Sequence, residues 1–192
     1  MPATSTPIST ARVFQISPLI RFTLLALYLA LTIPLPILAE VTGAPVPPLG
    51  LAVGIAIGLV VLVGVLSERV ESSDREVGVT YPVWIRWLRK GWSLPWSDIR
   101  DLSFRTTGQG GLIYYFVSKS GRAYLLPMRI VGFQQFLASV RENTEIDTST
   151  VRALAQPWMY IALLGCTLLL LLTDAWAIAT GLQQLGISLA VL

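Results

Sequence analysis

The chain has 192 residues, of which 54% are hydrophobic and only 13% are charged. A soluble domain carries about 25% charged residues, so this composition is typical of an integral membrane protein. The sequence contains no histidine and a single cysteine, Cys166. An intramolecular disulfide, a His-based acid/base pair and a Cys/His zinc site are therefore excluded.

The first apolar stretch follows a polar opening. Residues 1–18 are rich in Thr, Ser and Pro, which predicts a flexible tail. Residues 19–38 are long enough to cross about 30 Å of hydrocarbon as a helix. Pro34 and Pro36 should kink or end this helix. A basic start and a small residue at Ala39 leave a cleavable signal peptide as the alternative.

A second span is expected at residues 49–67. The short link before it contains three prolines, so residues 19–67 should form a transmembrane hairpin. Gly50, Gly54 and Gly58 recur every four residues and share one helical face, which predicts a helix-packing surface. Its partner is either the first span of the same hairpin or a separate membrane protein.

Residues 68–152 differ from the rest of the chain because they hold 12 of its 14 Lys and Arg residues. This charge density is that of a soluble domain. Alternating apolar residues predict strands at 99–106, 112–118 and 122–126, separated by glycine-containing turns. Apolar residues at helical spacing predict a helix at 129–143 that covers the sheet. The expected fold class is an α-helical membrane protein with three transmembrane helices and a small α+β domain between the second and the third.

Residues 80–92 fit two structures. As a short helix, they would place aromatic residues on one face and basic residues on the other, as in a segment lying on a bilayer surface. As a strand, they would extend the sheet. In either case the four tryptophans between residues 84 and 96 could instead pack together as part of a core. In the first case the contacts with the membrane surface or a partner would be made by Trp84, Arg86, Trp87, Arg89 and Lys90.

A third span is expected at residues 157–179, after Pro157 and two interfacial aromatic residues. With three spans, every Lys and Arg lies on one face of the membrane. The positive-inside rule then predicts a cytoplasmic N-terminus and central domain, with residues 180–192 on the opposite side. Asp174 lies low in the third span, where it is either an interfacial residue or a buried partner or proton site.

No pattern in the sequence indicates catalysis. The glycine-rich residues 108–111 lack the Lys-Ser/Thr of a phosphate-binding loop and read as a hairpin turn. We therefore expect no enzymatic activity and no catalytic, cofactor-binding or metal-binding residues. The net charge of +3 follows from the inside-positive bias and does not indicate nucleic-acid binding.

Several motifs carry a resemblance to known families. Residues 91–143, which start with GWSLPWSDI and end in the amphipathic helix, resemble a shortened bacterial pleckstrin-homology-like (PH-like) domain, a family often tethered behind a pair of transmembrane helices. Together with TTGQGGLIYYF, SKSGRAYLLPMR and LAQPWMY, they are similar to an uncharacterised three-span membrane family of photosynthetic bacteria. The layout also resembles a photosystem I assembly factor that has two spans and lacks the third.

These resemblances imply a class of role rather than individual residues. We expect a non-catalytic assembly or scaffold factor in the inner (plasma) or thylakoid membrane, with membrane lipids and other integral membrane proteins as partners. One alternative is a membrane-surface module that binds anionic lipids. The other is an accessory subunit of a transporter.

Overall fold

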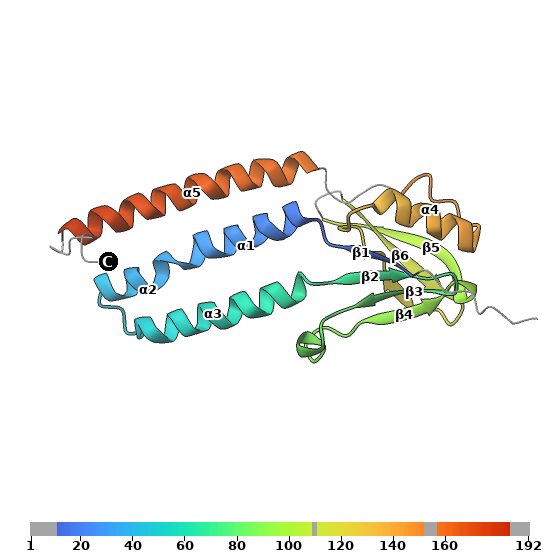
Figure 1. Cartoon of the computed structure of the whole chain (residues 1–192), viewed down its shortest axis with the longest axis horizontal. Helices are drawn as coiled ribbons and strands as arrows, with labels where there is room; N and C mark the ends of the chain where they lie inside the picture. Colours follow the sequence, from blue (N-terminus) through green and yellow to red (C-terminus); the bar gives the residue numbers. More distant parts are fainter. Residues whose placement is uncertain (1–10, 109–110, 152–156, 185–192) are drawn as a thin grey trace, which may run out of the picture. The chain divides into compact units, whose positions relative to one another are not determined.

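The computed structural model describes residues 11–108, 111–151 and 157–184 (Figure 1). They form two compact units. The sheet unit comprises the described residues up to Ser17 and those from Gly64 to 151. The helical unit comprises Pro18–Val63 and the third span.

Three helices are long and apolar enough to cross a membrane, namely Pro18–Val41, Pro48–Val65 and Pro157–Thr180. The first is divided at Ile33 into α1 (Pro18–Thr32) and α2 (Pro34–Val41). The division follows from Pro34, which has no N–H to donate to the preceding turn. The other two are α3 (Pro48–Val65) and α5 (Pro157–Gln184). The three predicted apolar helices are thus confirmed, including the interruption by proline.

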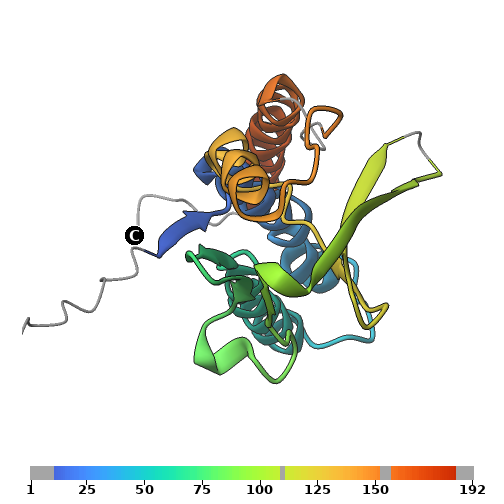
Figure 2. The same ribbon diagram turned by 90° about the vertical axis from the view of Figure 1, so that its right-hand side faces the viewer.

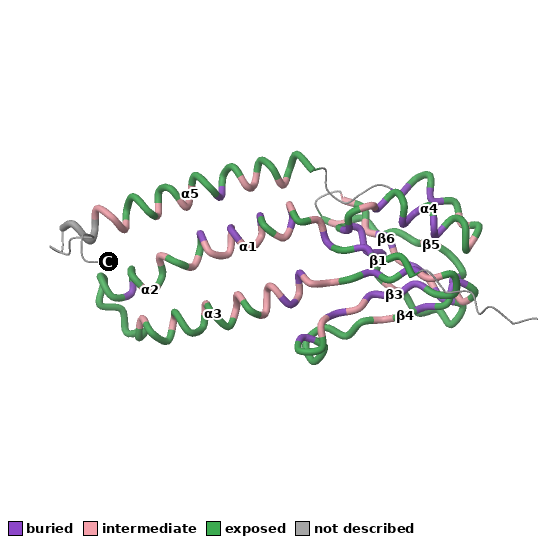
Figure 3. The backbone as a smooth tube through the Cα atoms, in the orientation of Figure 1, coloured by how far each residue is buried: buried purple, intermediate pink, exposed green. Residues whose placement is uncertain are grey.

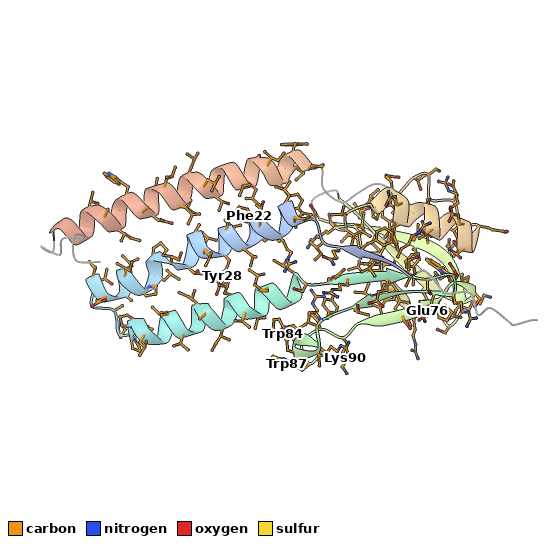
Figure 4. The ribbon with its side chains drawn as sticks, in the orientation of Figure 1. Phe22, Tyr28, Glu76, Trp84, Trp87 and Lys90 are labelled. Atoms are coloured by element: carbon orange, nitrogen blue, oxygen red, sulfur yellow. The ribbon has the colours of Figure 1, made fainter. Side chains whose placement is uncertain are left out.

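Within the helical unit, α1 contacts both α3 and α5. Its buried residues fall on one face, and it packs against α5. The Tyr28 hydroxyl, on α1, donates a 2.8 Å hydrogen bond to the carbonyl oxygen of Ile55, on α3 (Figure 4). The Tyr28 ring lies so close to Gly58 that a Cβ there would overlap the hydroxyl.

The other two glycines of the predicted packing face lie differently. A Cβ on Gly54 would meet nothing within 4 Å, and one on Gly50 would meet only Pro47, in the link before α3. The three glycines therefore do not form one continuous contact. Only Gly58 lies against the first span.

The sheet unit begins with a four-stranded antiparallel sheet in the order β1-β2-β3-β4. Its strands are β1 (Arg12–Gln15), β2 (Arg69–Ser72), β3 (Glu76–Thr80) and β4 (Trp92–Pro95). Strand β1 pairs with β2 from Arg12 opposite Ser72 to Gln15 opposite Arg69. On its other side, β1 is bonded to the segment before α4, where the Val131 N–H donates to the Gln15 oxygen at 2.8 Å.

Strand β1 corrects the prediction of a flexible tail over residues 1–18 for Arg12–Gln15, whereas residues 1–10 of that tail lie outside the described residues. Residues 12–15 are ordered because they complete a sheet whose other strands lie beyond the first two spans. Two of the three candidate membrane spans are thus inserted in the chain between two paired strands.

The second sheet has three antiparallel strands, β5 (Ile99–Thr106), β6 (Leu112–Ser118) and β7 (Ala123–Leu125). A single helix, α4 (Phe133–Thr144), follows them. The three strands occur where the alternating pattern predicted them. The helix starts at Phe133 rather than at residue 129, because Ile130 pairs with Ile16 and Gly132 precedes the helix in a left-handed conformation. The β5–β6 hairpin extends away from the first sheet and α4 (Figure 2), and its Phe104 side chain is 61% exposed.

The core of the sheet unit is aromatic and comes from distant parts of the chain. Phe116 on β6 and Phe136 on α4 are fully buried, with ring centroids 6.5 Å apart. The Phe14 ring, on β1, meets Phe136 edge-on at 5.7 Å. Buried residues concentrate in the strands and α4, whereas the outward faces of α3 and α5 are exposed (Figure 3). This contrast is typical of a soluble domain attached to lipid-facing helices.

Candidate functional site

The segment between β3 and β4, residues 82–90, forms a compact loop that we call the tryptophan loop. Pro82 is extended, and Val83–Ile85 form a single turn of 3-10 helix. The N–H groups of Leu88 and Arg89 both donate to the Ile85 oxygen at 3.0 Å. The shape of the loop is therefore held by hydrogen bonds within its own backbone.

Two side chains fix the loop to the start of the sheet unit. Ile85 is buried, and its side chain lies with the Trp84 ring against Gly64, in the last turn of α3. A Cβ on Gly64 would overlap that ring. Gly64 is the residue before the end of a candidate membrane span, Val65. The loop is thus built directly onto the point where the chain leaves this span.

The remaining apolar side chains of the loop are open to solvent. Val83 and Trp87 are 76% and 75% exposed, and Trp84 and Leu88 are each 47% exposed. Arg86, Arg89 and Lys90 are exposed beside them, and Trp84, Trp87 and Lys90 are labelled in Figure 4. A cluster of exposed apolar residues with a basic rim is typical of a surface that contacts a membrane or another protein.

The structure brings the five predicted contact residues together, but not on a helix. The sequence left a helix and a strand open for residues 80–92, and neither extends over the whole segment. Thr80 ends β3, Val83–Ile85 form one turn of 3-10 helix, and Trp92 begins β4. Tyr81 is buried, and Trp92 belongs to β4, where its ring lies 5.2 Å from that of Tyr124. Neither shares an exposed face with Trp87.

Sequence reasoning missed Val83 and the anchor Ile85. The only signal for the loop was the pair Pro82, which restricts the backbone, and Gly91, which permits conformations that other residues avoid. That signal marks the ends of a turn. It does not say which side chains between them point inward.

Beside the loop, a hydrogen bond joins Tyr81 to Glu68. The Tyr81 hydroxyl donates to the Glu68 carboxylate at 2.7 Å. Burial, followed by this hydrogen bond and the negative charge of Glu68, raises the pKa of Tyr81 above its ordinary value. The phenol is therefore held neutral, and it ties the loop to the segment that precedes β2.

The stability of the sheet unit should fall in strongly alkaline solution because of Tyr81. Above pH of about 10, an unfolded chain ionises this tyrosine while the folded chain keeps it protonated. Its contribution is complete below that pH and is lost as the pH rises toward the raised value. Urea unfolding between pH 8 and 11 should show the decline, and a Tyr81→Phe variant should show a smaller one. An identical decline in the variant would exclude this assignment.

Other residues of chemical interest remain apart. In residues 11–108, 111–151 and 157–184, no three His, Cys, Asp or Glu side chains are grouped closely enough to hold a metal ion. Cys166 is an exposed residue of α5. Asp174, also on α5, has a buried carboxylate oxygen that finds no hydrogen-bond partner in the part of the chain that is described.

Comparison with known proteins yields one relative. The uncharacterized protein slr0269 of Synechocystis sp. is 53% identical over 161 residues, which cover 82% of this chain and 81% of that protein. No family model matches the chain, and no solved structure matches it. At this identity and coverage, the chain belongs to the same family as this cyanobacterial protein.

Proposed function

We propose that this protein is a non-catalytic membrane-anchored scaffold, which assists the assembly of a membrane complex through its sheet unit. The observation that carries the proposal is the tryptophan loop, a self-supported loop with Val83 and Trp87 about three-quarters exposed. Large exposed apolar side chains on a rigid support are the usual anchors of protein interfaces. Their position next to the end of α3 suits a partner that is itself in the membrane.

The fold of the sheet unit supports a binding role. A four-stranded and a three-stranded antiparallel sheet followed by one helix is the arrangement expected of a PH-like domain, and we assign the unit to that class. Seven strands and one helix give a stable platform from which loops present contact residues.

We further propose that the sheet unit faces the cytoplasm, from an inner (plasma) or thylakoid membrane. The pairing of β1 with β2 requires both ends of the hairpin to lie on one side. All Lys and Arg residues share that side if three helices span the membrane, which favours the cytoplasm. The cyanobacterial relative and the resemblance to a photosystem I assembly factor favour a photosynthetic membrane.

The scaffold role is tested by co-purification from native membranes. The wild-type chain at its natural level should migrate with a larger complex, whose members mass spectrometry can identify. A Val83→Ser/Trp87→Ser variant should lose this association by about thirtyfold or more, as expected for removal of a central aromatic anchor. A Phe104→Ser variant, which removes an exposed aromatic residue elsewhere, is the matched control. A wild-type chain that migrates as a free monomer would refute the proposal.

A second candidate function, binding to an anionic membrane surface, is favoured by Arg86, Arg89 and Lys90 beside the exposed tryptophans. An excised segment of residues 68–152 would lack β1, so the test needs the full chain. If proteins are the main target, reversing the three charges should leave both the complex and the contact between the loop and anionic bilayers intact. Loss of contact between the loop and anionic bilayers, with the complex retained, would instead assign these residues to lipid.

A further inference from the structure

The sheet unit contains a cavity of about 260 Å³ that the proposed scaffold role does not use. Its wall is largely apolar and is formed by side chains from β6 and the segment after β7, including Ile113, Leu126 and Met128. Three charged side chains, Glu68, Arg89 and Arg129, also line it. An apolar wall with a few charged groups is the usual construction of a small-molecule site.

The charged groups favour an anion. Both arginines are exposed, and in the described part of the chain neither forms an ion pair with a carboxylate. Glu68 already accepts the hydrogen bond of Tyr81. Two guanidinium groups without carboxylate partners can each offer paired N–H donors to a phosphate or sulfonate group.

The cavity lies where lipid headgroups are expected. Ile16 and Val65 both line it. Ile16 is two residues before the first residue of α1, and Val65 is the last residue of α3. Along the chain, these two lining residues therefore adjoin the ends of two candidate membrane spans.

The volume and the apolar wall of the cavity indicate a ligand that is larger than an inorganic anion and partly apolar. A water molecule in the liquid occupies about 30 Å³, so the cavity has room for a group several times larger. Its apolar side chains would be left unused by inorganic phosphate. A glycerol backbone and the first methylene groups of an acyl chain would cover them.

We propose that this cavity binds the headgroup of a single anionic glycerolipid, with Arg89 and Arg129 holding the negative group and the apolar wall covering the glycerol. This lipid would fix the sheet unit against the membrane. Arg89 belongs to both the tryptophan loop and the cavity, whereas Arg129 lines the cavity and lies outside the loop. Lipid retention and association with partners can therefore be measured separately.

Native mass spectrometry of the full chain tests the proposal. The protein would be reconstituted in bilayers of equal parts phosphatidylcholine and phosphatidylglycerol and then released in mild detergent. The wild-type chain should retain one phosphatidylglycerol in preference to phosphatidylcholine. An Arg89→Gln/Arg129→Gln variant should lose this retention by about tenfold for each arginine removed. The matched control is Arg75→Gln/Arg122→Gln, which removes two exposed arginines of the same unit that do not line the cavity.

A second variant separates the cavity from surface charge. Ile113→Phe keeps both arginines but narrows the cavity, and it should also reduce lipid retention. The proposal is overturned if the wild-type chain retains both lipids equally, if the control loses as much as the double variant, or if Ile113→Phe retains lipid like the wild type. It is also overturned if inorganic phosphate alone raises the thermal midpoint as much as phosphatidylglycerol, because the site would then bind a free anion.

Discussion

Replacing Phe14 with alanine should destabilise the sheet unit by about 3–5 kcal/mol. Phe14 is only 7% exposed, and its ring meets that of Phe136 edge-on at 5.7 Å. Phe136 in turn contacts Phe116 and Phe133. Truncation at Phe14 would therefore leave a cavity beside the most buried part of α4. A loss of this size is a large fraction of the stability of a small domain.

The neighbouring residue provides the control. Val13 lies on the same strand but faces outward and is 52% exposed, so Val13→Ala should cost well under about 1 kcal/mol. Pulse proteolysis of the full chain in detergent, at increasing urea concentrations, measures unfolding of the sheet unit for both variants. Equal midpoints for the two would mean that β1 is not part of the core, and that the hairpin is not inserted between paired strands.

Strand β1 also shows why part of the fold was not predictable from sequence. Strands β5, β6 and β7 are joined by short turns, so local alternation and glycine-containing loops were enough to place them. Strand β1 has only four residues, and its partner β2 lies beyond two membrane spans. A strand this short has no local signal, since its stability comes from a sheet formed by distant residues.

The conformation of the tryptophan loop was left open by the sequence for a different reason. Spacings of three and four residues among its aromatic side chains fit a helix, and Thr80 and Gly91 fit its ends. Trp92 nevertheless pairs opposite Val79 in the sheet. It is therefore part of a strand and does not belong to the aromatic face that a helix would have. The identity of the contact residues was predictable from composition. Their support on Gly64 was not, because it depends on the approach of two separated segments.

The proposed lipid cavity could not have been predicted from the sequence. Its wall combines residues from before α1, from the end of α3, from the tryptophan loop and from β6. No motif links these positions, and each arginine alone reads as ordinary surface charge. Only the folded sheet unit places them together.

Gly91→Ala should cost about 1–3 kcal/mol and loosen the tryptophan loop. A Cβ on Gly91 would overlap the carbonyl oxygen of Val79, and it would lie 3.4 Å from the Cα of Thr80. Both are backbone atoms of β3, so a rotamer change cannot relieve the overlap and the strands must separate locally. The loop returns to the sheet at this point only because the residue has no side chain.

Trypsin reports on the loosened loop because Arg86, Arg89 and Lys90 are cleavage sites within it. In Gly91→Ala, cleavage there should accelerate by about tenfold, which corresponds to roughly 1.4 kcal/mol of easier local opening. Gly108→Ala is the control, since a Cβ on Gly108 would meet nothing within 4 Å. The same substitution tests the scaffold role, because a rigid support is what gives an exposed tryptophan its value as an anchor. If cleavage accelerates while the association with the complex is unchanged, the contact does not depend on the loop being preformed.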